Sequence, residues 1–253
     1  MFYSKKLKKF KNLYHCFFSR KNGFSSGLYE SLNCGQGSKD LKINIVKNLN
    51  YISLKSGVKK NKLILMNQTH SNKVKFVNKK INFSLRIKAD ALITDLKNVT
   101  IGVLTADCVP ILLYDDDNKV VGCIHAGWKG SFSGIIENTI KKFNEINSKN
   151  KIFASIGPCI GMNNYEVKEN FYKIFLNKSK LNKRFFKKID SKKFKFNLRK
   201  YVENKLLDCG VKNIDHINLD TFRDSEHFFS YRRSKILEES DYGRCISTIS
   251  LKT

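Results

Sequence analysis

Two apolar segments and an acidic turn constrain the fold of this 253-residue chain most. Residues 99–105 and 109–114 are almost wholly apolar, and the turn sequence Asp-Asp-Asp-Asn at 115–118 leads into a further segment, 119–125. Short apolar runs bounded by turn residues are typical of buried strands. The pattern therefore predicts a buried β-hairpin, with residues 119–125 as the returning strand.

Strands and helices alternate only in part along the rest of the chain. Further strands are predicted at residues 63–66, 152–156, 227–231 and 244–251, and helices from about Ser133 and over residues 197–210. No sequence repeat and no Pro/Gly/Ser-rich linker divides the chain. We expect an α+β fold built on a mixed sheet, in one domain over residues 1–253.

The chain is strongly basic, with 48 Lys and Arg against 22 Asp and Glu and a net charge of +26. Lys outnumbers Arg by 40 to 8, which points to a lysine-biased surface and a biased genome composition before it points to a nucleic-acid partner. The cations crowd residues 178–200, where four Phe residues are interleaved with them. We expect these Phe residues to be buried beneath a lysine-rich loop, and no specific nucleic acid to bind.

Cysteine usage and hydropathy indicate a cytoplasmic protein. The seven Cys are irregularly spaced and include no Cys-x-x-Cys pair, as expected of free thiols in a reducing compartment. The basic N-terminus lacks the apolar stretch of a signal peptide. The longest apolar region, residues 99–114, is too short to cross a bilayer, so no membrane association is expected.

The hairpin brings two metal-binding residue types together. If residues 115–118 form the loop, Tyr114 pairs with Lys119, and Cys108 then lies directly opposite His125 on one face. A thiolate and an imidazole at that separation can share one Zn²⁺, although a buried Cys is more often a small hydrophobic residue. His70, in a polar turn after an apolar strand, is a candidate for the third ligand.

Six ordered motifs resemble those of the laccase-domain (YfiH-like) family. These purine nucleoside phosphorylases were formerly described as multicopper polyphenol oxidases. The motifs are FFSR at 17–20 with SLN at 31–33, QTHS at 68–71, ADALIT at 89–94, TADCVP at 105–110 with HAGWKG at 125–130, GPCI at 157–160 with YEV at 165–167, and FFSYRR at 228–233 with GR at 243–244. Lys129 and Thr69 depart mildly from residues that are common in the family.

The resemblance implies a layered α/β/β/α sandwich with large mixed β-sheets. It also implies zinc bound by His70, Cys108 and His125, with copper as an adventitious alternative. The implied reactions are phosphorolysis of adenosine, inosine, guanosine and methylthioadenosine, and deamination of adenosine. Purine nucleosides and phosphate are therefore the expected partners, and the protein is expected to be a monomer or a homodimer.

Roles for individual residues follow from this resemblance and from residue chemistry. Cys108 and His125 are expected to be catalytic through the metal, and Asp107 either carries protons or caps the turn before Pro110. Arg suits phosphate because its guanidinium binds oxyanions in a bidentate manner, and Arg20 and Arg232 are the candidates. Because Arg232 and Arg233 alternate along a predicted strand, at most one of them should face the site.

Three other functions remain open from the residues. A copper-dependent polyphenol oxidase is disfavoured, because the chain has only five His and no His-x-His pair. A metal-free cysteine hydrolase would use Cys108 as nucleophile and His125 as base. A basic nucleic-acid-binding protein would bind in a salt-sensitive manner through residues 178–200.

Overall fold

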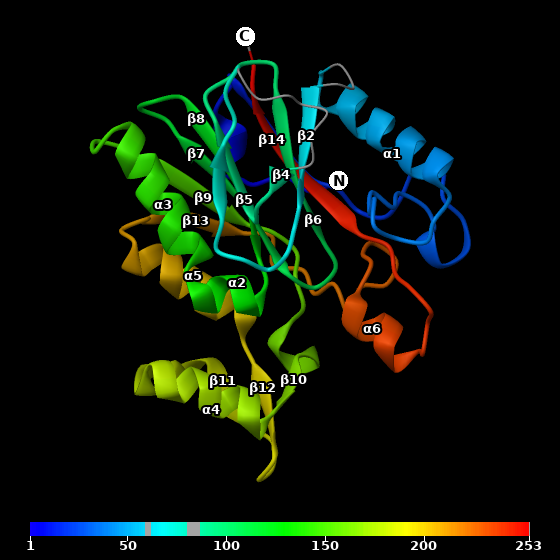
Figure 1. Cartoon of the computed structure of the whole chain (residues 1–253), viewed down its shortest axis with the longest axis vertical. Helices are drawn as coiled ribbons and strands as arrows, with labels where there is room; N and C mark the ends of the chain where they lie inside the picture. Colours follow the sequence, from blue (N-terminus) through cyan, green and yellow to red (C-terminus); the bar gives the residue numbers. More distant parts are fainter. Residues whose placement is uncertain (59–61, 80–86, 253) are drawn as a thin grey trace.

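Two mixed β-sheets form the centre of the computed structural model, which describes residues 1–58, 62–79 and 87–252 (Figure 1). The five-stranded sheet has the order β1 (Leu13–Phe17), β14 (Cys245–Leu251), β6 (Thr100–Thr105), β2 (Leu63–Asn67) and β4 (Ile87–Lys88). The six-stranded sheet has the order β13 (Asn213–His216), β9 (Ile152–Ile156), β7 (Val109–Asp115), β8 (Val120–Ala126), β5 (Ala91–Thr94) and β3 (Val74–Phe76). Both sheets contain parallel and antiparallel pairs.

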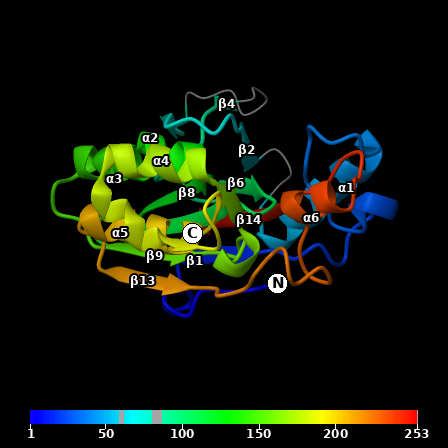
Figure 2. The same cartoon turned by 90° about the horizontal axis from the view of Figure 1, so that it is seen from below.

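Helices cover the outer face of each sheet, as Figure 2 shows from below. The described α-helices are α1 (Lys42–Lys55), α2 (Trp128–Ser133), α3 (Ile135–Ile146), α4 (Glu169–Lys178), α5 (Leu198–Asp208) and α6 (Tyr231–Ile236). The α1 helix lies against the five-stranded sheet and α2, α3 and α5 against the six-stranded sheet, whereas α4 and α6 lie below both sheets in Figure 1. Short 3₁₀ helices occupy Leu7–Lys9, Gly27–Tyr29, Met162–Asn164 and Lys180–Phe185. None of the described helices is long and apolar enough to span a membrane.

Strand alternation divides the apolar residues among the layers. On β7, Leu112 and Tyr114 join the core between the sheets, whereas Ile111 and Leu113 pack toward α3 and α5. Every residue of β7 and of β8 is buried, because both faces of this sheet are covered. The α1 helix packs Ile52 against the opposite sheet. The α/β/β/α layering with large mixed sheets is therefore confirmed, while the limits of the domain at residues 1 and 253 stay a prediction.

The predicted hairpin exists, but its register is wrong by two. The loop comprises residues 116–119, Asp115 pairs with Val120, and Pro110 rather than Cys108 lies opposite His125. Asp115 stays in the strand because its buried carboxylate accepts the loop amides of Asp117 and Asn118, at 3.1 and 3.4 Å. A shift of two residues keeps the same face, so Cys108 and His125 still approach each other, now as diagonal neighbours.

Two further sequence predictions are corrected by local capping. Residues 227–231 do not form a strand: Ser230 caps α6, its hydroxyl accepting the amide of Arg233 at 3.1 Å. The helix predicted from about Ser133 is confirmed as α3, but its cap is Gly134, whose positive φ of 97° ends the preceding helix α2 and starts α3. The helix predicted over residues 197–210 is confirmed as α5, capped by the Asn197 side chain.

The lysine-rich segment, residues 178–200, is not the loop that the sequence predicts. It supplies β11 (Phe186–Lys188) and β12 (Lys193–Phe196) of a small three-stranded sheet with β10 (Glu166–Lys168), seen at the bottom of Figure 1. Phe185, Phe194 and Phe196 are buried, and Phe186 is half-buried, as the sequence predicts. Phe196 stacks on Phe186, with ring centroids 4.7 Å apart. The aromatic residues therefore form a core here rather than an exposed stacking surface.

Candidate metal site and cleft

Three side chains from separate segments converge at the ends of central strands. His70 lies in the turn after β2, Cys108 lies just before β7, and His125 lies near the end of β8. One potential ligand atom from each lies within 4.8 Å of the other two. The Cys108 Sγ is 3.8 Å from the His70 Nε2, and the two imidazole rings meet edge to face with centroids 4.6 Å apart. This group can hold a single metal ion.

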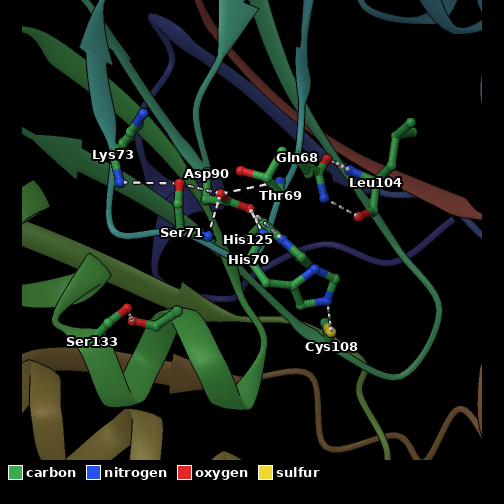
Figure 3. A network of polar contacts seen from close by, with 11 residues as sticks. Gln68, Thr69, His70, Ser71, Lys73, Asp90, Leu104, Cys108, His125 and Ser133 are labelled. Atoms are coloured by element: carbon green, nitrogen blue, oxygen red, sulfur yellow. Dashed lines mark hydrogen bonds and ion pairs between the residues drawn. The ribbon is translucent and has the colours of Figure 1, made fainter.

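A buried carboxylate positions both histidines (Figure 3). Asp90 Oδ1 lies 2.8 Å from the His125 Nδ1 and accepts the backbone amide of His70 at 3.0 Å. Asp90 Oδ2 accepts the amide and the hydroxyl of Ser71, at 2.7 and 2.6 Å. These contacts stabilise the turn in which His70 takes a left-handed φ of 58°. Sequence analysis missed Asp90, although a charged residue between Ala89 and Ala91 at the start of an apolar strand signals a buried, partnered carboxylate.

Two neighbouring residues complete the frame of this group. The Gln68 side chain accepts the amide of Leu104 at 2.8 Å and donates to its carbonyl at 2.7 Å, which extends the pairing of β2 with β6 to the His70 turn. Gly127 lies against the site: a Cβ there would be 2.9 Å from the Cys108 Sγ and 2.8 Å from the His70 Cδ2. Only glycine fits at this position without displacing a ligand.

The three side chains alter one another's protonation. Burial raises the pKa of Cys108, but the adjacent His125 and His70 outweigh it and bring the thiol pKa down to about 7. Burial lowers the pKa of His125, but Cys108 and Asp90 outweigh that effect and raise it to about 9. At neutral pH without a metal, about half of Cys108 is therefore thiolate, beside a His125 that is mostly imidazolium.

The donor set fits zinc. Two imidazoles and a thiolate are preferred zinc ligands, and three protein ligands are typical of a catalytic zinc site. The carboxylate on the Nδ1 of His125 leaves the Nε2 for the metal, an arrangement common around ligating histidines. Soft thiolate ligation also suits Cu(I). The residues establish a possible metal site without fixing the identity of the metal.

The three residues line a cleft of about 1070 Å³. The other lining residues include the cations Lys129, Lys168, Arg232 and Arg244, the acidic residues Asp107 and Glu166, the aromatic residues Trp128, Tyr165, Phe171, Tyr231 and Tyr242, the polar residues Gln36, Gln68 and Thr69, and aliphatic side chains. The rings of Trp128 and Phe171 lie 4.8 Å apart, so the cleft contains flat apolar surface as well as the group formed by His70, Cys108 and His125 (the metal-type group). Such a cleft is suited to a planar ligand that carries or accompanies an anion.

The arginines of the sequence motifs divide between cleft and scaffold. Arg232 lines the cleft, and its Nη1 donates to the carbonyl of Glu166 at 2.9 Å. The neighbouring Arg233 instead donates to backbone carbonyls, including that of Thr221 at 2.8 Å. Only one of this pair lines the cleft, although they lie on α6 and not on a strand. Arg20 lies outside the described residues that line the cleft and donates to the carbonyls of Glu30 and Ser225.

Asp107 lies beside Cys108, and its carboxylate accepts three hydrogen bonds from the protein. Its oxygens accept the Thr221 and Ser230 hydroxyls at 2.7 and 2.9 Å and the Arg232 amide at 2.7 Å. Burial raises the pKa of this carboxyl, and the three donors oppose the rise. The contacts resemble those of a scaffold residue more than those of a group open to substrate.

A layered α/β/β/α sandwich with a His–Cys–His group in a cationic cleft defines the structural class of this protein. Comparison of the sequence identifies the family: the chain belongs to the family described as multi-copper polyphenol oxidoreductase laccase, which it matches over residues 14–252. The family predicted from the sequence motifs is thereby confirmed.

Relatives and solved structures match nearly the whole chain. A purine nucleoside phosphorylase of Rickettsia prowazekii is 37% identical over 96% of this chain and 98% of its own length. The purine nucleoside phosphorylase of Haemophilus influenzae is 31% identical over 94% of both chains. The crystal structure of the hypothetical protein YfiH of Bacillus licheniformis superposes with a TM-score of 0.88 at 27% identity, covering 95% of this chain and 93% of that one.

Proposed function

We propose that this protein is a purine nucleoside phosphorylase, which converts a purine nucleoside and phosphate to the free base and ribose 1-phosphate. One observation carries the proposal: a single cleft combines the His70, Cys108 and His125 group with cationic and aromatic side chains. The names of the relatives agree with it, since those of Rickettsia and Haemophilus are both described as purine nucleoside phosphorylases.

The cleft residues have distinct roles in this reaction. In phosphorolysis a phosphate oxygen bonds to C1′ of the ribose while the C1′–N bond breaks and its electrons leave with the base. Arg232 is the proposed phosphate contact, because two of its guanidinium nitrogens have no hydrogen-bond partner among the described residues. The Lys129 side chain also lines the cleft and supplies further positive charge. No hydrogen bond joins its ammonium group to another described residue. Tyr165 and Trp128 offer aromatic surface to the purine.

Arg20 was the other phosphate candidate from the sequence, and its position changes the proposal. Its guanidinium lies 4.4 Å from the Phe229 ring and donates to two backbone carbonyls. We therefore assign Arg20 to holding the loops beside the cleft, and keep Arg232 for phosphate.

The metal we propose is zinc, held by His70, Cys108 and His125. When bound, zinc supplies a Lewis acid beside the purine, which would favour both loss of the base and deamination of adenosine. Asp90 would keep His125 in the tautomer and orientation that ligation requires. Adenosine, inosine, guanosine and methylthioadenosine are the proposed phosphorolysis substrates, and copper is the proposed adventitious alternative to zinc.

The test is a paired measurement of product and metal. Purified protein is incubated with inosine and phosphate, and zinc and copper are measured on the same sample. Hypoxanthine and ribose 1-phosphate in equal amounts support the proposal, as does loss of activity and zinc in Cys108→Ala. Full activity and full zinc occupancy in that variant would contradict the proposed site.

A metal-free cysteine hydrolase is the second candidate, favoured by the thiolate–imidazolium pair of Cys108 and His125. Alkylation that abolishes activity while leaving zinc in place would support it over the phosphorylase. Oxygen uptake with a phenol at stoichiometric copper would instead support the polyphenol oxidase. A cytoplasmic location and a monomeric or homodimeric state are further proposals, which fractionation and light scattering would test.

A further inference from the structure

Asp107 connects parts of the chain that are far apart in sequence. Its side chain accepts hydrogen bonds from Thr221, Ser230 and Arg232, while its own carbonyl accepts the amide of Ile160 at 3.0 Å. Asp107 is only 7% exposed and takes a left-handed φ of 83°, a conformation uncommon for residues other than glycine. A buried residue held in this way has its geometry set by tertiary contacts.

The segments joined by Asp107 form two sides of the cleft. Cys108, the next residue, lines the cleft as a member of the metal-type group. Arg232, whose amide Asp107 accepts, lines it from α6. The far end of the Arg232 side chain is also fixed, since its Nη1 donates to the Glu166 carbonyl and its guanidinium lies 5.4 Å from the Tyr165 ring. The position of Arg232 relative to Cys108 therefore depends on Asp107.

The contacts leave little room for proton transfer by this carboxyl. A carboxylate offers about four acceptor sites, and three are filled here by donors that belong to the scaffold. Displacing any of them to reach a substrate would leave a buried donor unpaired.

We propose that Asp107 is a positioning residue. It holds Arg232, the proposed anion contact, at a fixed position relative to Cys108 in the metal-type group. The inference rests on the proposed phosphorylase function for its effect on phosphate. The link between Asp107 and the start of α6 is independent of any activity. Loss of the carboxylate would therefore weaken phosphate binding while leaving the chemistry of bound substrate largely intact.

The test uses Asp107→Asn and the milder Thr221→Val, which removes one donor to the carboxylate and leaves the Ser230 cap of α6 in place. The amide of Asn cannot accept all three donors, so we expect the KM for phosphate to rise about 10–100-fold in Asp107→Asn. A smaller rise in the same direction is expected for Thr221→Val. In both variants kcat should change less than KM, zinc content should be unchanged, and the pH profile of kcat should keep its shape.

Ser234→Ala is the matched control. Ser234 lies on the same helix and its hydroxyl donates to the Tyr231 carbonyl at 2.8 Å, without touching Asp107. Its removal should leave the KM for phosphate within about twofold of the wild type, because it breaks no contact that fixes Arg232 to Asp107. A comparable rise in KM in this variant would show general loosening of α6 and would overturn the inference.

Hydrogen exchange of the ligand-free protein separates this inference from the proposed function. Amides of residues 231–236 should exchange faster in Asp107→Asn than in the wild type, whether or not the protein phosphorolyses nucleosides. Unchanged exchange, or an unchanged KM for phosphate, contradicts the positioning role. A fall in kcat with loss of one limb of its pH profile would assign proton transfer to Asp107 instead. Absence of phosphorolysis in the wild type would refute the proposed function alone.

Discussion

The cleft and the lysine-rich segment use their polar residues in opposite ways. In residues 89–138, which supply most of the metal-type group, there are only three Lys and no Arg, and the key polar side chains are buried and hydrogen-bonded. Residues 178–200 carry eleven Lys and Arg with a single Asp, and most of these cations are exposed while the Phe residues are buried. The density of charged residues along the sequence therefore does not locate the site in this chain. Buried polar side chains that have hydrogen-bond partners do locate it.

Removing a buried ring from the lysine-rich segment should have the largest effect on folding. Phe196 is fully buried among five aromatic rings, including Phe175 at 4.9 Å. We expect Phe196→Ala to lower the free energy of unfolding by about 3–5 kcal/mol, measured by urea denaturation. The exposed Lys192→Ala is the control, with a change within about 0.5 kcal/mol. Lost nucleic-acid affinity at unchanged stability would show that the rings form a binding surface.

Changing one carboxylate beside the cleft should weaken the metal site without unfolding the protein. We expect Asp90→Asn to reduce zinc affinity or activity by roughly 10–100-fold, because an amide cannot match the contacts to His125, His70 and Ser71. Competition with a chromophoric chelator measures the affinity. The exposed Asp95→Asn should bind zinc like the wild type. Equal zinc affinity in Asp90→Asn and Asp95→Asn would show that Asp90 does not support the metal site.

The protonation of Cys108 gives a third contrast, this time within the cysteines. With a pKa of about 7, Cys108 is mostly thiol at pH 6 and mostly thiolate at pH 8. Its alkylation rate in zinc-free protein should therefore rise about tenfold over this interval and then level off. Burial raises the pKa of Cys159 and Cys245 to about 11, so these should stay slow. Mass spectrometry of iodoacetamide adducts measures each rate. If the alkylation rate of Cys108 reached half its maximum only above pH 8.5, the lowering of the Cys108 pKa by His125 and His70 would be contradicted.

Neutralising exposed lysines should have the smallest effect. Lys187, Lys188 and Lys192 are exposed and lie outside the residues that line the cleft. Replacing all three with Gln should change kcat/KM by no more than about twofold at physiological salt, through a weaker pull on anionic substrate. Steady-state assays at low and high salt would measure it. A tenfold loss of kcat/KM would instead show that the lysine-rich segment takes part in the function.

Local pattern was enough to predict several elements of the fold. The strands at 152–156 and 63–66, the buried hairpin and the helix at 197–210 all follow from apolar spacing and turn residues. The hairpin register did not follow, because Asp115 reads as a loop residue while its carboxylate is satisfied inside the strand end. The start of α6 was missed because a single cap at Ser230 outweighs the aromatic, strand-like residues before it.

The candidate site was predictable in its ligand-type residues and not in its supports. His70, Cys108 and His125 stand out because His is scarce and their chemistry is distinctive, and the family motifs name the same three. Asp90 contacts segments about 20 and 35 residues away, and Asp107 contacts segments more than 100 residues away. Such long-range contacts depend on how the sheets stack, which no local pattern encodes. The same limit explains why Arg20 was expected to contact an anion.

The central claim is that His70, Cys108 and His125 hold a metal that serves a nucleoside phosphorylase cleft. The most direct test measures zinc content and inosine phosphorolysis together, in the purified protein, after chelator treatment and after zinc is restored. We predict about one zinc per chain, activity that falls with the zinc and returns with it, and neither in Cys108→Ala. Undiminished phosphorolysis in fully zinc-free protein, or full zinc occupancy in Cys108→Ala, would contradict the claim.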